Sequence, residues 1–288
     1  GLMLPFAFIK NKIIAYLLYV SGFLFYFVFM NIKSFYCKNF NKLQNFQNIF
    51  ILTILSYPFL YNMDKGNFDM ILFIILGLSV YAFKSEKYML SAILLAVENA
   101  CKPFPALFLL LFLFKKKYKE FFLSIILTAL LVVGGFMILP DNFFNQIIVL
   151  IKNLVFFKIV YVNNNNLSDA GMGFGSSLFM PLKLIFCKLS STPIISTYLL
   201  DKLYNYFSIA ITTITIFFTW KEKTYWKQLT LLICNFLLIP CITYDYKLIF
   251  LFIPLWLFVT QKEKTKFDLA YTILFALLLI TKNMVIVH

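Results

Sequence analysis

The chain has 288 residues, of which 62% are hydrophobic and only 13% carry a charge. Soluble globular chains are about half apolar and about a quarter charged, so the composition excludes an ordinary soluble domain and indicates a polytopic membrane protein. The net charge of +14 does not indicate nucleic-acid binding. Most lysines fall in short loops between apolar runs, where positive charge orients membrane helices.

Apolar runs follow one another along most of the chain, and a membrane helix needs about 20 apolar residues, with fewer in a short span. The predicted spans are 13–30, 49–61, 68–83, 88–100, 103–114, 120–140, 204–220, 229–240, 248–260 and 267–287. The sequence therefore predicts an all-α helix bundle of about ten spans. We expect residues 1–288 to form a single transmembrane domain.

Two segments between these runs have a different pattern. Residues 142–161 are apolar on one face but carry Lys152 and Lys158, which is typical of an amphipathic helix lying in the membrane interface. A polar loop follows it, and we expect 142–176 to form an extracytoplasmic helix and loop. Residues 178–189 are too few for a comfortable span, and they are predicted to be re-entrant or interfacial.

The orientation follows from the lysine-rich loops, because such loops stay in the cytoplasm. These loops are 31–47, 84–87, 115–119, 221–227 and 261–266. Alternating crossings place all of them on one side if residues 177–203 make no net crossing. Most carboxylates then collect at helix ends on the opposite face. We therefore expect a multi-pass protein of a bacterial plasma (inner) membrane, with its site on the extracytoplasmic face of the cell envelope.

A first polar cluster, residues 64–69, opens one of the apolar runs. Free N–H groups and the helix dipole at a helix start favour an anion, and Lys65 adds a positive charge. Gly66 permits close approach of the backbone. Asp64 or Asp69 can bind a sugar hydroxyl or a metal, or act as a base. The alternative is a helix cap within a solvated loop.

Two further polar clusters interrupt later runs. In residues 98–105, Lys102 lies beside the helix break at Pro103, and a break in a membrane helix must have its backbone groups satisfied. A phosphate pocket would explain the break, and a lysine reaching the membrane interface is the alternative. Residues 244–247, Tyr-Asp-Tyr-Lys, form the third cluster. The alternative interpretation of this cluster is an ordinary belt of tyrosines at the membrane interface.

These clusters carry a family resemblance. The sequence Gly66-Asn67-Phe68-Asp69 opens a helix, a basic loop follows at 84–87, and Lys102-Pro103-Phe104-Pro105 comes next. This order resembles the polytopic glycosyltransferases of GT-C architecture, specifically the family 87 enzymes of the polyprenyl-phosphate-mannose type. Residues 245–254 look like a later polar element of that family.

The resemblance implies a membrane glycosyltransferase that moves a mannose-like sugar from a polyprenyl-phosphate donor to an extracytoplasmic glycan or lipid acceptor. It implies inversion at the anomeric carbon, a carboxylate base and no nucleotide sugar. The residues expected to bind the donor phosphate or sugar are Lys65, Gly66, Asn67, Lys102, Asp245, Tyr246 and Lys247. We assign no cofactor and no metal site. The five cysteines are scattered and the single histidine is terminal, and the need for a divalent metal is not readable from the sequence.

Enzymes of GT-C type are expected to carry an essential aspartate in the first extracytoplasmic loop. This sequence begins with Gly1 and its first span starts at residue 13, so we expect an N-terminally truncated sequence whose catalytic base lies upstream. Asp64 and Asp69 are the candidates within it. Two other classes stay open: a transporter or flippase for a lipid-linked or anionic solute, and a structural membrane scaffold.

Overall fold

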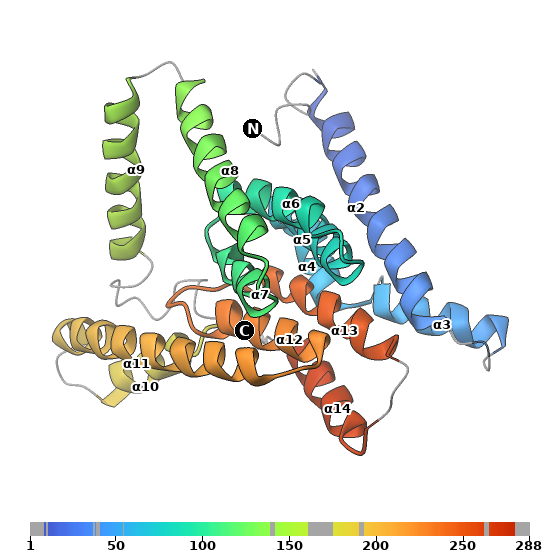
Figure 1. Cartoon of the computed structure of the whole chain (residues 1–288). Helices are drawn as coiled ribbons and strands as arrows, with labels where there is room; N and C mark the ends of the chain where they lie inside the picture. Colours follow the sequence, from blue (N-terminus) through green and yellow to red (C-terminus); the bar gives the residue numbers. More distant parts are fainter. Residues whose placement is uncertain are drawn as a thin grey trace. The chain divides into compact units, whose positions relative to one another are not determined.

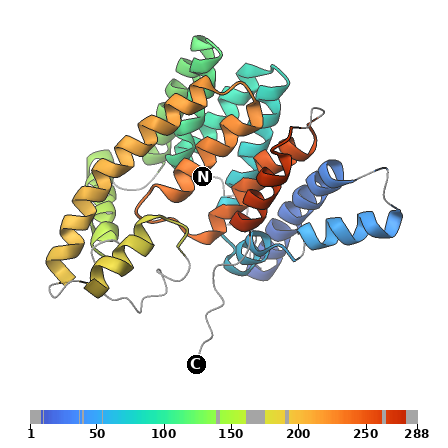
Figure 2. The same ribbon diagram turned by 90° about the horizontal axis from the view of Figure 1, so that it is seen from below.

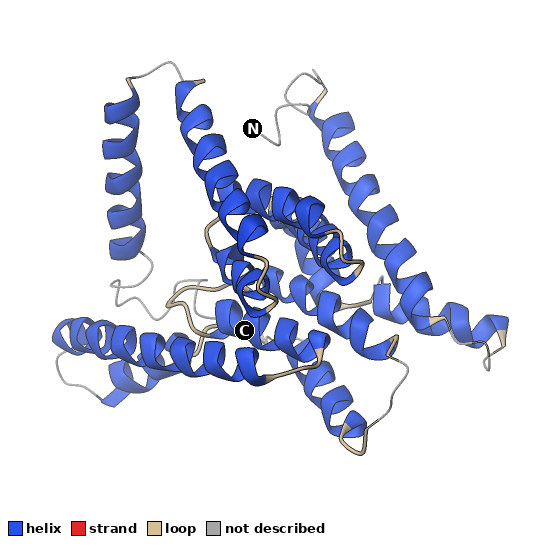
Figure 3. Cartoon of the chain, viewed as in Figure 1, coloured by secondary structure: helices blue, strands red, loops and turns tan. Residues whose placement is uncertain are grey.

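The computed structural model describes residues 9, 11–36, 38, 41–53, 55–138, 142–160, 175–189, 193–261 and 265–279. Within these ranges the chain is helical, and the one strand-like pairing is an isolated bridge between Gly175 and Tyr244 (Figure 3). The predicted all-α class is confirmed. Long apolar runs favour helices because a helix satisfies its own backbone hydrogen bonds away from water.

The chain divides into two compact units, Gly1–Leu127 with Tyr246–Thr281, and Thr128–Asp245 with Lys282–His288. The elements of the first unit are α2 (Lys12–Phe35), α3 (Lys42–Thr53), α4 (Tyr57–Lys65), α5 (Asp69–Lys84), α6 (Tyr88–Cys101), η1 (Phe104–Phe108), α7 (Leu109–Phe114), α13 (Phe252–Val259) and α14 (Asp268–Leu279). Those of the second are α9 (Phe143–Lys158), α10 (Phe179–Leu189), α11 (Pro193–Lys221) and α12 (Tyr225–Leu238). Two elements begin in one unit and end in the other: α8 (Tyr118–Met137) and η3 (Asp245–Leu251). Whether residues 1–288 form a single transmembrane domain stays a prediction.

An aromatic core holds the first unit together. Phe27 of α2 packs on Phe59 of α4 and Phe252 of α13, with ring centroids 5.0 and 4.8 Å apart. Phe23, Phe73 and Trp256 complete the cluster. Burying each such side chain contributes about 1.5–3 kcal/mol. The core therefore fixes α4 and α5, whose junction carries the first polar cluster, against α2 and α13.

Helices α5 and α6 form a closely packed hairpin (Figure 1). The hydroxyl of Ser79 contacts both the hydroxyl and the carbonyl of Ser91, each at 3.0 Å, so the two helices also share a buried polar contact. Because the hairpin is antiparallel, the first turn of α5 lies beside the last turn of α6. The fold thereby brings the first polar cluster next to the second.

In the second unit, α10 and α11 lie side by side (Figures 1 and 2), and α11 also packs on α12. Helices α10 and α11 meet at a small core of Phe179, Leu200 and Tyr204. Asn235 of α12 and Thr212 of α11 add a polar contact, with the asparagine amide donating at 3.3 Å. Residues 162–174 of the predicted extracytoplasmic loop lie outside the described residues, and the location of 142–176 stays a prediction.

The expected number of spans is not confirmed. Among the described residues, two helices are long and apolar enough to cross a membrane, α2 and α8. The predicted span 49–61 is wrong, because α3 ends at Thr53 and α4 starts at Tyr57 with Pro58 in its first turn. Proline is readily accepted at a helix start but breaks a helix interior.

Other predicted spans differ in their bounds. The span 248–260 is a 3₁₀ turn followed by the eight residues of α13. The span 204–220 is the last part of α11, which begins at Pro193. The short segment 178–189 is a separate helix, α10, of 11 residues.

Candidate functional site

The turn between α4 and α5 has a conformation that only glycine adopts easily. Helix α4 ends at Gly66, whose φ of +54° is in the left-handed region and whose N–H donates to the Met63 carbonyl at 3.3 Å. The side-chain oxygen of Asn67 then accepts from the Asp69 N–H at 3.1 Å and satisfies one backbone donor in the first turn of α5. These two local devices direct Asp69 away from solvent, and its side chain is fully buried.

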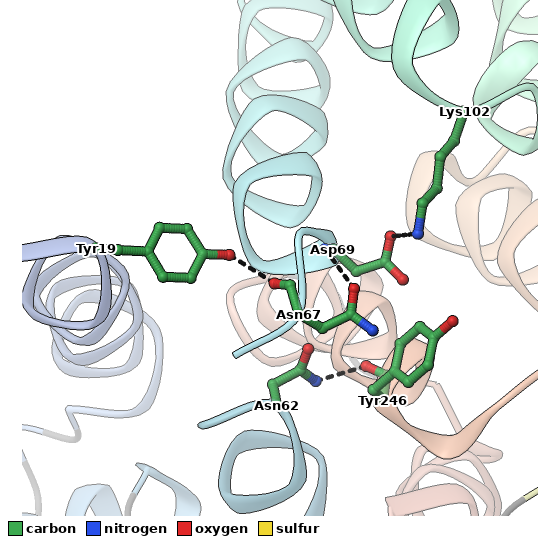
Figure 4. A network of polar contacts seen from close by, with 6 residues as sticks. All are labelled: Tyr19, Asn62, Asn67, Asp69, Lys102 and Tyr246. Carbon is green, nitrogen blue, oxygen red and sulfur yellow. Dashed lines mark hydrogen bonds and ion pairs between the residues drawn. The ribbon is translucent and has the colours of Figure 1, made fainter. Parts of the chain in front are cut away.

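Two tyrosines of α2 hold this turn from outside it. The hydroxyl of Tyr19 donates to the Asn67 carbonyl at 2.5 Å, and that of Tyr16 donates to the Met63 carbonyl at 2.7 Å. The Met63 carbonyl also accepts from the Gly66 N–H and the Asn67 carbonyl from the Met70 N–H, so each tyrosine adds a second bond to a carbonyl of the turn. Figure 4 shows Tyr19 reaching the turn from one side and Lys102 from another.

The centre of the site is an ion pair between the two polar clusters. Helix α6 ends at Cys101, and the extended backbone of Lys102 turns its side chain toward Asp69. The Lys102 ammonium contacts one Asp69 carboxylate oxygen at 2.5 Å, and the lysine side chain is 29% exposed while the aspartate is 0% exposed (Figure 4). Lys102 also lies 5.8 Å from the ring centre of Tyr246. The partly exposed side chain of Lys102 therefore lies between solvent and the buried Asp69 carboxylate.

The segment that begins with Tyr246 supplies a second cation. The Asn62 amide donates to the Tyr246 carbonyl at 2.6 Å and to the Pro58 carbonyl at 2.8 Å, which fixes this segment on α4 (Figure 4). The ammonium of Lys247 lies 4.8 Å from the ring centre of Phe104. Lys247 lies just before the predicted span 248–260 and therefore outside it. Burial lowers the pKa of Lys247, the Asp69 charge opposes this shift, and Lys102 adds to it.

The last turn of α6 buries two polar side chains next to this pair. Glu98 is 0% exposed and Asn99 is 9% exposed. The Asp69 charge acts directly on Glu98. Neither side chain has a hydrogen-bond partner among the described residues. The arrangement therefore combines two cations, two carboxylates and an amide around the α4–α5 turn.

The structure brings five of the predicted site residues together: Asn67, Asp69, Lys102, Tyr246 and Lys247. Gly66 forms the turn beside them. Asp64 is exposed on the last turn of α4, and the side chain of Lys65 lies outside the described residues. Asp245 belongs to the second unit, where its carboxylate accepts from the Ser176 hydroxyl. Its assignment to donor binding stays a prediction.

Sequence reasoning missed Tyr16, Tyr19 and Asn62. A tyrosine in an apolar helix gives no signal of its partner, and Tyr19 contacts a carbonyl 48 positions away. Asn62 did carry a signal, because it is an amide directly after an apolar run. Among the described residues, no group of three or more His, Cys, Asp and Glu side chains is arranged to hold a metal ion.

Comparison with known families decides the class of the protein. The sequence model of glycosyltransferase family 87 matches residues 1–238. The chain belongs to glycosyltransferase family 87. No curated protein and no solved structure gave a significant match.

Membership of family 87 confirms the expected enzyme class and favours a glycosyltransferase over a transporter or a scaffold. Family 87 membership implies sugar donor and acceptor substrates and association with a membrane, in agreement with the two apolar helices. The match includes Asp69, Glu98 and Lys102, whereas residues 245–247 follow the matched range.

Proposed function

We propose that this glycosyltransferase moves a mannose-like sugar from a polyprenyl-phosphate donor to a glycan or lipid acceptor on the extracytoplasmic face of the membrane. The observation that carries the proposal is the ion pair of Lys102 with the buried Asp69, with Lys247 close enough for the Asp69 charge to act on it. Two lysines from separate segments suit a phosphate ester, because ammonium groups form strong charge-assisted bonds to phosphate oxygens. The donor sugar then lies beside the buried carboxylates.

Binding of the donor phosphate also changes the Asp69–Lys102 ion pair. A donor phosphate competes with Asp69 for the Lys102 ammonium, and Lys102 has the exposure needed to reach it. As Lys102 turns to the phosphate, Asp69 loses its cation and becomes a better proton acceptor. Donor binding thereby prepares a carboxylate for catalysis.

The transfer proposed here is a single displacement with inversion. The acceptor oxygen forms a bond to the anomeric carbon while the bond from that carbon to the phosphate oxygen breaks. A carboxylate takes the acceptor proton, and polyprenyl phosphate leaves with the bonding electrons. Lys102 and Lys247 stabilise the charge on the leaving phosphate. Asp69 is better placed than the exposed Asp64 to serve as a base near these lysines.

The direct test supplies labelled mannose to the full-length enzyme in proteoliposomes, either on polyprenyl phosphate or on GDP. We expect product from the lipid-phosphate donor without any nucleotide. Transfer from GDP-mannose with an inert lipid donor would overturn the proposal.

The side of the membrane is tested separately by labelling single cysteines with an impermeant reagent. Asp64→Cys should report the extracytoplasmic side and Lys84→Cys the cytoplasm. Labelling of both from the same side would contradict the proposed orientation, because Asp64 lies on the last turn of α4, just before α5, and Lys84 is the last residue of α5.

A further inference from the structure

Asp69 and three buried side chains near it have hydrogen-bonding atoms that no described residue satisfies. The atoms are Asn62 Oδ1, Asp69 Oδ2, both carboxylate oxygens of Glu98, and both amide atoms of Asn99. The first three side chains are 0% exposed and the fourth is 9% exposed. A buried polar atom without a partner costs free energy, so such a concentration needs a reason.

Other buried polar side chains of the same unit do have partners. The Asn31 side-chain oxygen accepts from the Trp256 indole at 2.8 Å. Ser79 contacts Ser91 at 3.0 Å. The unsatisfied atoms are therefore not a general property of polar burial in this unit. They gather at the start of α5, the end of α6 and the end of α4.

The packing of the hairpin makes these atoms one group. Asp69 begins α5, Glu98 and Asn99 end α6, and the Asp69 charge acts on Glu98. Asn62 is joined to the same region through the Tyr246 carbonyl. The partly exposed Lys102 adjoins the group and is its route to solvent.

The chemistry of the group selects its ligand. Five of the six atoms are oxygens that accept hydrogen bonds, and one is an amide donor. The Asp69 carboxylate repels an anion, so the phosphate belongs with the lysines and not here. A ligand with several neutral O–H donors fits, since each hydroxyl can also accept from the Asn99 amide.

We propose that Asn62, Asp69, Glu98 and Asn99 form a subsite for the hydroxyl groups of the donor sugar, adjacent to the lysines that hold the donor phosphate. This inference rests on the proposed function and extends it. It assigns sugar recognition to the last turn of α6, and in particular to Glu98. A site that hydrogen-bonds a hydroxyl discriminates strongly against a ligand that lacks it, because the buried groups of the site are then left unpaired.

The test compares two ligands that differ only in the sugar: polyprenyl phosphate and polyprenyl-phosphate mannose. Their dissociation constants are measured on the full-length enzyme and on Glu98→Gln, with Glu86→Gln as the matched control because Glu86 is exposed in the α5–α6 turn. We expect Glu98→Gln to reduce the affinity gained from the sugar by about 10- to 100-fold, the effect of leaving a buried hydrogen-bonding group without its partner. Binding of polyprenyl phosphate should not change.

The outcomes separate the two proposals. If the variant keeps the full affinity gained from the sugar, or loses affinity for both ligands equally, the subsite is wrong. If the unaltered enzyme binds neither ligand, the proposed function fails instead.

A second variant, Glu98→Met, checks the cause by thermal unfolding. Replacing an unsatisfied carboxylate with an apolar side chain of similar size should raise the melting temperature while the gain from the sugar is lost. A lower melting temperature would mean that Glu98 has a structural partner, and it would overturn the subsite.

Discussion

Both compact units bury an aspartate completely, Asp69 in the first and Asp245 in the second, but they satisfy it differently. The Asp245 carboxylate accepts from the Ser176 hydroxyl, and the Ser176 N–H donates to the Thr243 carbonyl at 2.8 Å. A bridge between Gly175 and Tyr244 continues this pairing. Asp245 therefore joins two segments of its own unit.

Asp69 instead has one oxygen paired with a partly exposed lysine and one oxygen without a partner among the described residues. Neighbouring Glu98 and Asn99 add further unsatisfied atoms. In the described part of the second unit, the hydroxyl of Thr243 is a buried and unsatisfied neutral group. On our proposal, Asp245 stabilises the fold, whereas Asp69 keeps bonding capacity for a ligand.

The sharpest test replaces each aspartate with its neutral isostere. Asp69→Asn should lower kcat/KM by about 100-fold or more, because a general base contributes about 10²–10⁴-fold. Asp245→Asn should change kcat/KM little but lower the melting temperature by several degrees, since its charge-assisted bond is worth about 1.5–3 kcal/mol. If Asp245→Asn impairs donor use at an unchanged melting temperature, Asp245 belongs to the donor site as the sequence predicted.

Removing the lysine of the ion pair should have the next largest effect. Lys102→Ala is expected to lower kcat/KM for the lipid-phosphate donor by about 10- to 100-fold, through a lost bond to phosphate worth about 1.5–3 kcal/mol. Lys84→Ala is the control, because Lys84 is exposed at the end of α5. Equal and small effects would support a lysine that only reaches the membrane interface.

A double variant separates catalysis from stability in this pair. Lys102→Ala leaves Asp69 buried without its cation, so it should also lower the melting temperature. Asp69→Asn combined with Lys102→Ala should recover most of that stability without recovering activity. Recovery of both would show that the pair acts only on stability.

A smaller effect is expected at the turn that aims Asp69. In Gly66→Ala the left-handed backbone costs about 1–2 kcal/mol, and the new Cβ lies 3.0 Å from the Tyr16 ring. The melting temperature should fall by a few degrees and donor use several-fold. Gly22→Ala is matched to it, because Gly22 is within helix α2 with nothing within 4 Å of an added Cβ. That variant should gain about 0.5–1 kcal/mol of stability; a loss similar to that of Gly66→Ala would exclude backbone conformation as the cause.

The smallest effect should come from the tyrosines of α2. Tyr19→Phe removes one hydrogen bond to the Asn67 carbonyl, worth about 0.5–1.5 kcal/mol, and should weaken catalysis a few-fold. Tyr16→Phe should have less effect, because Tyr16 is 44% exposed and water can replace its bond, whereas Tyr19 is 7% exposed. Thermal unfolding and donor kinetics on both variants check this order. The reverse order would show that burial does not decide the strength of these bonds.

The sequence predicted the clusters of the site better than its arrangement. Charged and amide residues stand out in apolar runs, so residues 64–69 and 98–105 were visible, and the antiparallel hairpin of α5 and α6 follows from their short connection. Tyr246 contacts Asn62 and Lys102 in the structure, and the binding role of Tyr246 and Lys247 stays a prediction. In the sequence, Lys102 is a candidate phosphate ligand and Asp69 a candidate hydroxyl ligand or base. Only the structure shows that the two side chains pair with each other.

Other features were beyond sequence reasoning because they depend on tertiary contacts. Asp245 and Tyr246 are neighbours in the sequence, yet the boundary between the units lies between them. Hydropathy gave a continuous run over 49–61 where Pro58 starts a new helix. The unsatisfied state of Glu98 is a property of its surroundings, and no pattern in the residues around it records that state.

The first unit is made from two stretches of chain, and this has a consequence for biosynthesis. Asp69 and Lys102 leave the ribosome before the whole span 128–245, and only then do Tyr246 and Lys247 follow. At a synthesis rate of about 5–20 residues per second, the delay is on the order of 10 s. During that interval the early helices insert with their ionic pair already able to form but with the second lysine missing. On our proposal, a nascent chain therefore cannot hold a lipid-phosphate donor, and the enzyme starts to consume donor only after its late segment has docked.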